Sequence, residues 1–289
     1  MRMRVRHRGP SPLIVLSGVL MGVLFGLVGV APAQAQQLEA PWAERINEEL
    51  APVPFGPGER LEYQVKLGAF TVGESWMRVH GVERVRGHRT YHVSMGIQGG
   101  IPMARVDNLL ESWIDVETLS SRRFVQDQDE VRTQRFRQFE FYPEERRYER
   151  ADIDESGELP TDQPLDDIAF VYYVRTLPLE VGETYELDRY FQEDGNPVVV
   201  KVVRRDQVEV PAGTFNTIVV QPIIQTRGLF GEGGEAEIHF SDDSRRLLVQ
   251  LRSRVPVMGS LSLHLRNITP GRSLRPLAFS EAVEEYRGG

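Results

Sequence analysis

Apolar and polar residues alternate along most of the chain, with the two-residue period of half-buried β-strands. Between residues 60 and 67, every second position from Leu61 to Leu67 is apolar, and charged or amide side chains lie between them. Similar segments follow at short spacing, separated by turns rich in Gly and Pro: 71–80, 90–98, 105–116, 122–131, 133–142, 146–151, 184–191, 198–205, 207–210, 214–221, 236–241, 246–255 and 261–268. This pattern predicts roughly a dozen strands in an antiparallel sheet or barrel.

Residues 164–178 depart from this pattern and predict the one helix of the domain. Asp166 is suited to cap its first free backbone amides, and Pro178 prevents its continuation. One side of the helix is apolar at the spacing i, i+3, i+4, i+7, with Phe170, Tyr173, Val174 and Leu177. A second apolar side is interrupted by Arg175. A helix that is apolar on two sides should be covered on two sides.

These elements predict a mainly β fold, built as a large curved antiparallel sheet or a partly open β-barrel crossed by one central helix at 166–177. So many strands in a flat open sheet would curl or split. No internal repeat and no break in composition divides the chain, so we expect a single domain over residues 58–268. A lead-in segment, 36–57, precedes it, and a C-terminal tail, 269–289, follows it.

The first 35 residues are typical of a signal peptide. Four arginines precede an apolar run at 13–30, and Ala33-Gln34-Ala35 supplies the small-x-small pattern of a cleavage site. We expect cleavage after Ala35 and a periplasmic or secreted protein with no membrane span. The alternative is an uncleaved anchor, because the apolar run is about long enough to cross a bilayer. The chain has no Cys, which excludes a lipid-modified N-terminus, disulfides and thiolate chemistry.

Charge narrows the range of partners. The net charge is −8, and removal of a leader with four arginines and no acid makes it −12. An acidic chain argues against nucleic acid as a partner and against electrostatic docking to anionic membranes.

The order of short motifs along the chain carries a family resemblance. These motifs lie at 57–63, 164–167, 172–175, 178–183, 210–215 and 241–246. Together they resemble the bacterial DUF3108 family of exported proteins of unknown function, over about residues 55–268. The resemblance implies a secreted, β-rich protein and supplies no catalytic residues. The expected fold is also similar to periplasmic lipoprotein carriers, in which a curved sheet and a helix enclose an acyl-binding cavity, but a likeness of fold is a weak argument for function.

Two loops place large apolar side chains beside glycines, at 99–103 and 228–231, and 257–259 is a lesser third. Such tips would form the mouth of a cavity or contact a lipid, or else fold back onto the sheet edge. The predicted ligand-binding residues are Phe170, Tyr173, Val174, Leu177, Ile101, Met103, Leu229 and Phe230. We therefore expect a non-enzymatic protein that binds a hydrophobic or amphipathic ligand such as a lipid. The alternative is an envelope scaffold that binds another protein.

Three histidines around one hairpin turn are candidate metal ligands. His80, His88 and His92 lie within thirteen residues, with Glu83 as a fourth candidate ligand. The spacing matches no recognised zinc signature, and we interpret these residues as surface histidines. We predict no metal and no cofactor.

Catalysis has little support in the sequence. The acid pairs Asp166-Asp167 and Asp242-Asp243 stand where a helix start and a turn favour acids for structural reasons. The segment 73–77, Gly-Glu-Ser-Trp-Met, lacks the last Gly of a nucleophile elbow. We therefore predict no catalytic residues and no enzyme.

Overall fold

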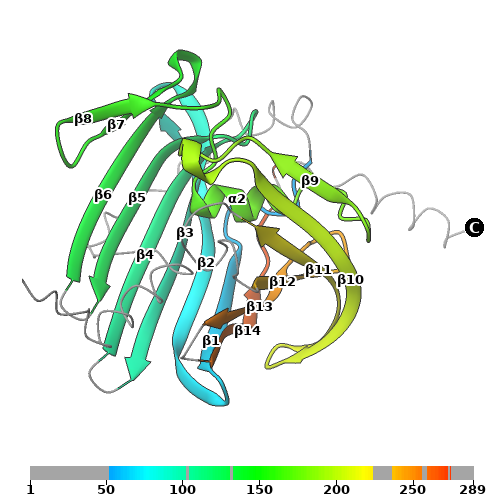
Figure 1. Cartoon of the computed structure of the whole chain (residues 1–289). Coiled ribbons are helices and arrows are strands. Elements are labelled where there is room, and N and C mark those ends of the chain that lie inside the picture. The colour runs from blue at the N-terminus through cyan, green and yellow to red at the C-terminus, as the bar shows by residue number, and fades with distance from the viewer. Residues whose placement is uncertain are drawn as a thin grey trace, which may run out of the picture.

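The computed structural model describes residues 52–101, 104–130, 133–223, 236–255, 259–272 and 274. Within these ranges, fourteen strands form one antiparallel sheet that curves around a single α-helix (Figure 1). The predicted fold class, a large curved antiparallel sheet with one central helix, is confirmed. No helix in the described part of the chain is long and apolar enough to cross a membrane.

The structure sets the following bounds. In chain order the elements are β1 (Arg60–Leu67), β2 (Phe70–Val85), β3 (His88–Ile101), β4 (Ala104–Asp115), β5 (Ser121–Glu130), β6 (Thr133–Tyr142), η2 (Pro143–Glu145), β7 (Arg147–Arg150), β8 (Glu155–Glu158), α2 (Asp167–Val174), β9 (Thr184–Leu187), η3 (Glu193–Gly195), β10 (Val198–Val210), β11 (Gly213–Ile223), β12 (Ala236–Ser241), β13 (Leu248–Val255) and β14 (Gly259–Thr269).

Two differences from the predicted strands stand out. The acidic segment at 152–161, expected to be a loop, contains the short strand β8. The segments 198–205 and 207–210, expected as two strands, form one strand, β10, with a register shift between Val202 and Arg204. A bulge bends a strand without ending it, so the break in alternation does not mark a strand boundary.

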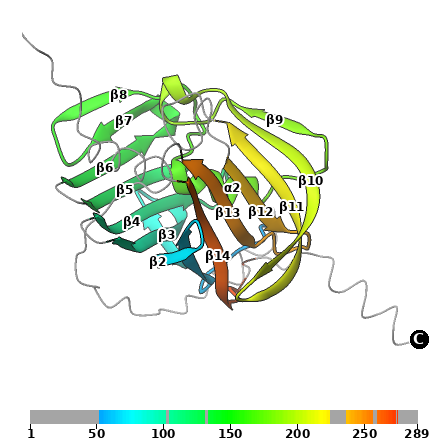
Figure 2. The same cartoon turned by 60° about the horizontal axis from the view of Figure 1, so that its bottom comes forward.

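The sheet consists of two meanders, β1–β8 and β9–β14, joined where β1 pairs with β14. The meanders lie on opposite sides of α2 (Figure 2). The strands β8 and β9 are the two edges, so backbone pairing does not close the sheet into a barrel. Between these edges, the segments on either side of the opening meet at a parallel bridge of Leu165 and Tyr190.

The alternation of side chains decides which face of the sheet turns toward the helix. Leu61 of β1 pairs with Met77 of β2, which pairs with Met95 of β3, and all three are buried. Their neighbours in sequence point to the other face, and most of them are polar, such as Arg60, Glu62 and Arg78. We call the face that packs against α2 the inner face. The core also includes Val53 and Phe55, which precede the first strand.

The helix is shorter than predicted. It begins as expected, because Asp166 Oδ1 accepts hydrogen bonds from the amides of Ile168 and Ala169, both at 2.9 Å. It ends at Val174 and not at residue 177. The amides of Thr176 and Leu177 bond to carbonyls three residues back, at 2.9 and 3.1 Å. The chain thus tightens into a final turn before Pro178, as helix ends often do.

Arg175 was expected to interrupt an apolar side of the helix, and instead it is buried, with 1 % of its surface exposed. Its guanidinium donates to both carboxylate oxygens of Glu59, at 2.7 and 2.9 Å. It also donates to the carbonyls of Pro54 and Arg245, both at 3.1 Å. These bonds tie the C-terminal end of α2 to the start of β1 and to the β12–β13 connection. Both sides of the helix are covered, as predicted.

The inner face therefore has two ends. At one end lie the start of β1, the β4–β5 connection and α2, whose N-cap Asp166 accepts from Ser112 of β4 at 2.6 Å. We call this the helix end. Strands β1, β3, β5, β11 and β13 run toward the opposite end and stop there, because the strands alternate in direction. We call this the loop end.

Candidate functional site

Toward the loop end of the first meander, the inner face changes from apolar on β3 to polar on β5 and β6, whereas Phe124 and Phe139 keep it apolar nearer the helix end. Two cross-strand rows follow this change: Met95, Leu110, Gln126 and Arg137, and next to it Ile97, Asn108, Gln128 and Arg135. Glu130 lies one row closer to the loop end, beside Val106. We call the polar members of these rows the polar wall: Asn108, Gln126, Gln128, Glu130, Arg135 and Arg137.

Most of the polar wall is buried. Asn108 Nδ2 donates to Glu130 Oε1 at 3.2 Å, and burial raises the pKa of Glu130. Gln128 is 2 % exposed, and its Nε2 finds no hydrogen-bond partner among the described residues. A buried amide that loses its water without gaining a partner costs about 1–3 kcal/mol. Such a group calls for an explanation beyond the packing of the fold.

Arg137 is the second unusual member. Its side chain is half-buried on the inner face. Burial lowers its pKa, the charges of Arg135 and Arg150 lower it further, and the charges of Asp152 and Asp167 partly offset this effect. Within the described ranges, its guanidinium forms no hydrogen bond and no ion pair. A desolvated guanidinium that no carboxylate contacts directly is suited to bind an anion, because its planar donors match carboxylate and phosphate oxygens.

The start of the helix borders this wall. Asp167 accepts hydrogen bonds from Tyr190 Oη at 2.9 Å and from Gln126 Nε2 at 3.4 Å. Burial, followed by the charge of Asp166, raises the pKa of Asp167 to about 7. Burial also raises the pKa of Asp166 to about 6. Asp166 has the capping role that the sequence predicts, and Asp167 holds Tyr190 and Gln126 in place.

The predicted ligand-binding residues do not gather at one described place. Phe170 and Val174 are buried in the core, with 5 % and 1 % exposed, and Tyr173 and Leu177 pack against it, partly buried. Ile101 ends β3 at the loop end, where its backbone pairs with Ala104. Met103, Leu229, Phe230 and the lesser loop at 257–258 lie outside the described residues. The predicted set therefore stays a hypothesis.

Sequence reasoning did not identify the polar wall. The segment 121–130 is mixed in composition, and only the pairing of β5 with β4 shows which of its residues face the helix. The signal that was available is the alternation of Gln126, Gln128 and Glu130, three polar residues at a spacing of two.

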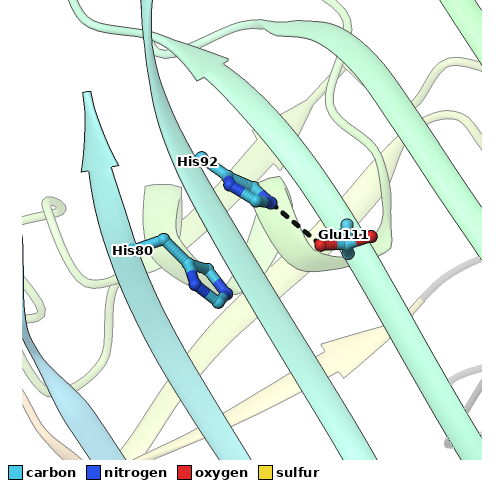
Figure 3. A group of neighbouring side chains, drawn as sticks. All are labelled: His80, His92 and Glu111. Carbon is cyan, nitrogen blue, oxygen red and sulfur yellow. Dashed lines mark hydrogen bonds and ion pairs between the residues drawn. The ribbon is translucent and has the colours of Figure 1, made fainter. Parts of the chain in front are cut away.

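The outer face carries a second cluster, on β2, β3 and β4 (Figure 3). The rings of His80 and His92 stack with centroids 4.4 Å apart, and Trp113 stacks on the other side of His92, also at 4.4 Å. His92 Nε2 lies 2.9 Å from Glu111 Oε1, and His92 Nδ1 lies 3.1 Å from Glu83 Oε1. Two carboxylates therefore hold the two nitrogens of one imidazole.

This cluster differs from the one considered in the sequence. His88 lies four positions from His92 on β3, and its ring contacts Asp115 at 3.5 Å and Glu144 at 3.9 Å. In the structure, Glu111 belongs to the cluster and His88 does not. Sequence spacing did not suggest Glu111, because this residue belongs to the next strand. Glu83, considered as a ligand, hydrogen-bonds to the back of His92.

A comparison with solved structures found matches at low sequence identity. A β-barrel-like protein of the DUF1849 family from Brucella abortus is 9 % identical, with a TM-score of 0.48, and the match covers 75 % of this chain and 98 % of that one. A hypothetical protein from Chlamydia trachomatis is 7 % identical, with a TM-score of 0.35, covering 80 % and 93 %. A comparison with curated proteins found no match. The sequence matches the family described as "Protein of unknown function (DUF3108)" over residues 62–266, and the chain therefore belongs to the DUF3108 family.

Proposed function

We propose that this protein is an exported, non-enzymatic binding protein for an anionic amphiphile, such as a fatty acid or an anionic phospholipid. The observation that carries the proposal is Arg137, a half-buried cation on the inner face that forms no hydrogen bond or ion pair within the described part of the chain. Asp152 and Asp167 act on Arg137 only through their charges. A carboxylate or phosphate head would supply the direct contact. Gln128, with its unpaired Nε2, lies in the adjacent row as a further donor.

The surroundings of the polar wall suit the apolar part of such a ligand. Ile97 is the direct neighbour of Asn108, and the inner face continues through β1 and β14 with Val65 and Leu263, which pair with each other. All three apolar side chains are buried. A ligand with its head at the polar wall and its chain along β1, β3 and β14 would meet matching chemistry at both ends.

The proposed location rests on the leader sequence. A basic start, an apolar run and the Ala33-Gln34-Ala35 pattern favour export. A periplasmic protein that binds an amphiphile would hold it away from water during its stay between membranes.

Native mass spectrometry of the mature protein, purified from its own envelope and followed by denaturing extraction, tests this function. We expect a co-purifying anionic lipid, and uptake of added oleate but not of oleyl alcohol, which has the same chain without the charge. Arg137→Gln should weaken oleate binding about 10- to 100-fold, the range for loss of a charged hydrogen bond. The matched control is Arg105→Gln, which removes an exposed arginine on the outer face and should leave binding unchanged.

Two results would overturn the proposal. One is a clean protein mass with no uptake of either probe, which would shift the function to the alternative of a protein partner in the envelope. The other is equal weakening by Arg137→Gln and Arg105→Gln, which would show that oleate binds by surface charge and not at the polar wall.

A further inference from the structure

We propose that His80, His92 and Glu111 on the outer face form a binding site for a divalent transition-metal ion of the zinc class. Each residue offers one ligand atom, and these atoms all lie within 4.8 Å of one another (Figure 3). The site is independent of the proposed ligand on the inner face, because it lies on the opposite side of the sheet.

The strands bring the three residues together through pairing and a bulge. Val79 pairs with Val93 and Gly81 pairs with His92, so His80 is an extra residue between two paired positions. A bulge of this kind re-aims the side chain of the extra residue, and bulges are common beside active sites. Glu111 pairs with Ser94, two positions from His92 on the same face. The arrangement therefore depends on backbone geometry and not on long flexible side chains.

The donor set matches the chemistry of zinc. Two imidazoles and one carboxylate are the protein ligands of several zinc sites that keep a fourth position open. Ligand atoms around one tetrahedral zinc ion lie about 3.3 Å apart, given bonds of about 2.0–2.1 Å. His92 Nε2 and Glu111 Oε1 are 2.9 Å apart. An ion that replaces the proton between them would need this pair to open by only about 0.4 Å.

The third ligand requires one rearrangement. The rings of His80 and His92 are within 18° of parallel, and the lone pairs of parallel rings do not converge on one point. The His80 residue is exposed, and its Nε2 shares a hydrogen bond with Ser94 Oγ at 2.8 Å. Binding of the ion therefore requires this exposed ring to turn about its χ2 bond and to give up its hydrogen bond with Ser94.

Residues behind the site orient His92 as a metal ligand. Its Nδ1 lies 3.1 Å from Glu83 Oε1, and Glu83 Oε2 accepts from Trp113 Nε1 at 2.9 Å. A ligating histidine usually donates its second nitrogen to a carboxylate in this way, which fixes the tautomer and the ring orientation. The Trp113 ring lies 6° from parallel to His92 and holds its plane.

Zinc chloride titrated into the mature, untagged protein after treatment with a chelator tests the site by calorimetry and equilibrium dialysis. We expect one equivalent to bind with micromolar or tighter affinity. His92→Gln and His80→Gln should each weaken binding more than about 100-fold, and Glu83→Gln about 10- to 100-fold, as for residues behind a metal ligand. The matched control is His88→Gln, which removes a histidine of the same strand outside the cluster.

A second readout covers the case in which His92→Gln does not fold. Zinc at about 100 times its dissociation constant should raise the melting temperature of the wild type and of His88→Gln, because an ion that binds only the folded state stabilises it. The variant His80→Gln changes an exposed residue and should lose this rise in melting temperature. Absence of stoichiometric zinc binding by the wild type would overturn the proposal, and so would an affinity that His88→Gln lowers as much as His80→Gln does.

Discussion

Two arginines on the inner side of the sheet show how differently a buried cation is used. Arg175, at the helix end, is 1 % exposed and is held by Glu59 and by the carbonyls of Pro54 and Arg245. Arg137, in the polar wall, has no hydrogen bond or ion pair with any described residue. The first cation joins three segments of the fold. The second forms no such contact, and the proposed binding of an anionic ligand rests on this difference.

The same contrast extends to the neighbouring polar groups. At the helix end, Asp166 accepts from two backbone amides and from Ser112. In the polar wall, Gln128 Nε2 is buried without a partner in the described residues. The bonds of Asp166 therefore stabilise the fold, whereas the unpaired amide of Gln128 lowers its stability unless something binds it.

The largest expected effect comes from breaking the Arg175–Glu59 pair. Arg175→Met leaves Glu59 buried without its partner, and we expect a loss of about 3–5 kcal/mol in the free energy of unfolding. Urea denaturation followed by circular dichroism measures this loss. The double variant Glu59→Gln with Arg175→Met should be more stable than Arg175→Met alone, because no charge is then left unpaired. Equal stabilities would mean that the pair is not desolvated as the structure indicates.

The second effect is a dependence on pH at the border of the two regions. Burial raises the pKa of Asp167 to about 7 in the folded protein, so the unfolded chain gives up this proton more easily. Its contribution to stability is therefore complete at pH below about 4 and is lost as pH rises through about 7. Asp167→Asn cannot ionise, and between pH 5 and 8 its stability should rise relative to the wild type, on the order of 2 kcal/mol.

Comparison of the two proteins at each pH is essential to this test. Burial lowers the pKa of His239 and His264 to about 4, and these groups add stability as pH rises through the lower part of the same window. Their contribution cancels in the difference between wild type and variant. The control Asp154→Asn, at an exposed carboxyl, should keep the pH profile of the wild type. A profile of Asp167→Asn parallel to the wild type would contradict the raised pKa.

The smallest expected effect on stability is in the polar wall. Gln128→Leu replaces a buried, unpaired amide by an apolar side chain of similar length, and we expect a stability equal to the wild type or about 1 kcal/mol higher. Thermal unfolding measures the change. A loss greater than about 2 kcal/mol would show that Gln128 has a structural partner, and that the polar wall resembles the helix end after all.

The fold was predictable because its signals are local. The two-residue alternation shows the strands, and a short acid at Asp166 followed by Pro178 limits the helix. The role of Arg175 was not predictable, because its partner Glu59 lies 116 residues away in sequence. A charged residue in a helix is read as exposed unless its partner is known. The predicted helix is too long for a related reason. The apolar spacing continues to Leu177, although the hydrogen bonding changes after Val174.

The two candidate sites depend on strand register, which a single sequence does not give. The spacing of histidines drew attention to His88 beside His92, whereas the bulge at His80 and the pairing of β3 with β4 select His80 and Glu111. Likewise, the polar residues of β4, β5 and β6 become one wall only when the strands are aligned. The apolar loop tips, which sequence favoured, lie in part outside the described residues.

The measurement that tests the central contrast most directly combines binding and stability in one variant. Oleate uptake by native mass spectrometry and urea denaturation are compared between the wild type and Arg137→Gln. If Arg137 binds the ligand and does not stabilise the fold, the oleate affinity of the variant should be about 10- to 100-fold weaker. Its free energy of unfolding should lie within about 1 kcal/mol of the wild type. Unchanged uptake by a stable variant, or a loss of stability close to that of Arg175→Met, would contradict this proposal.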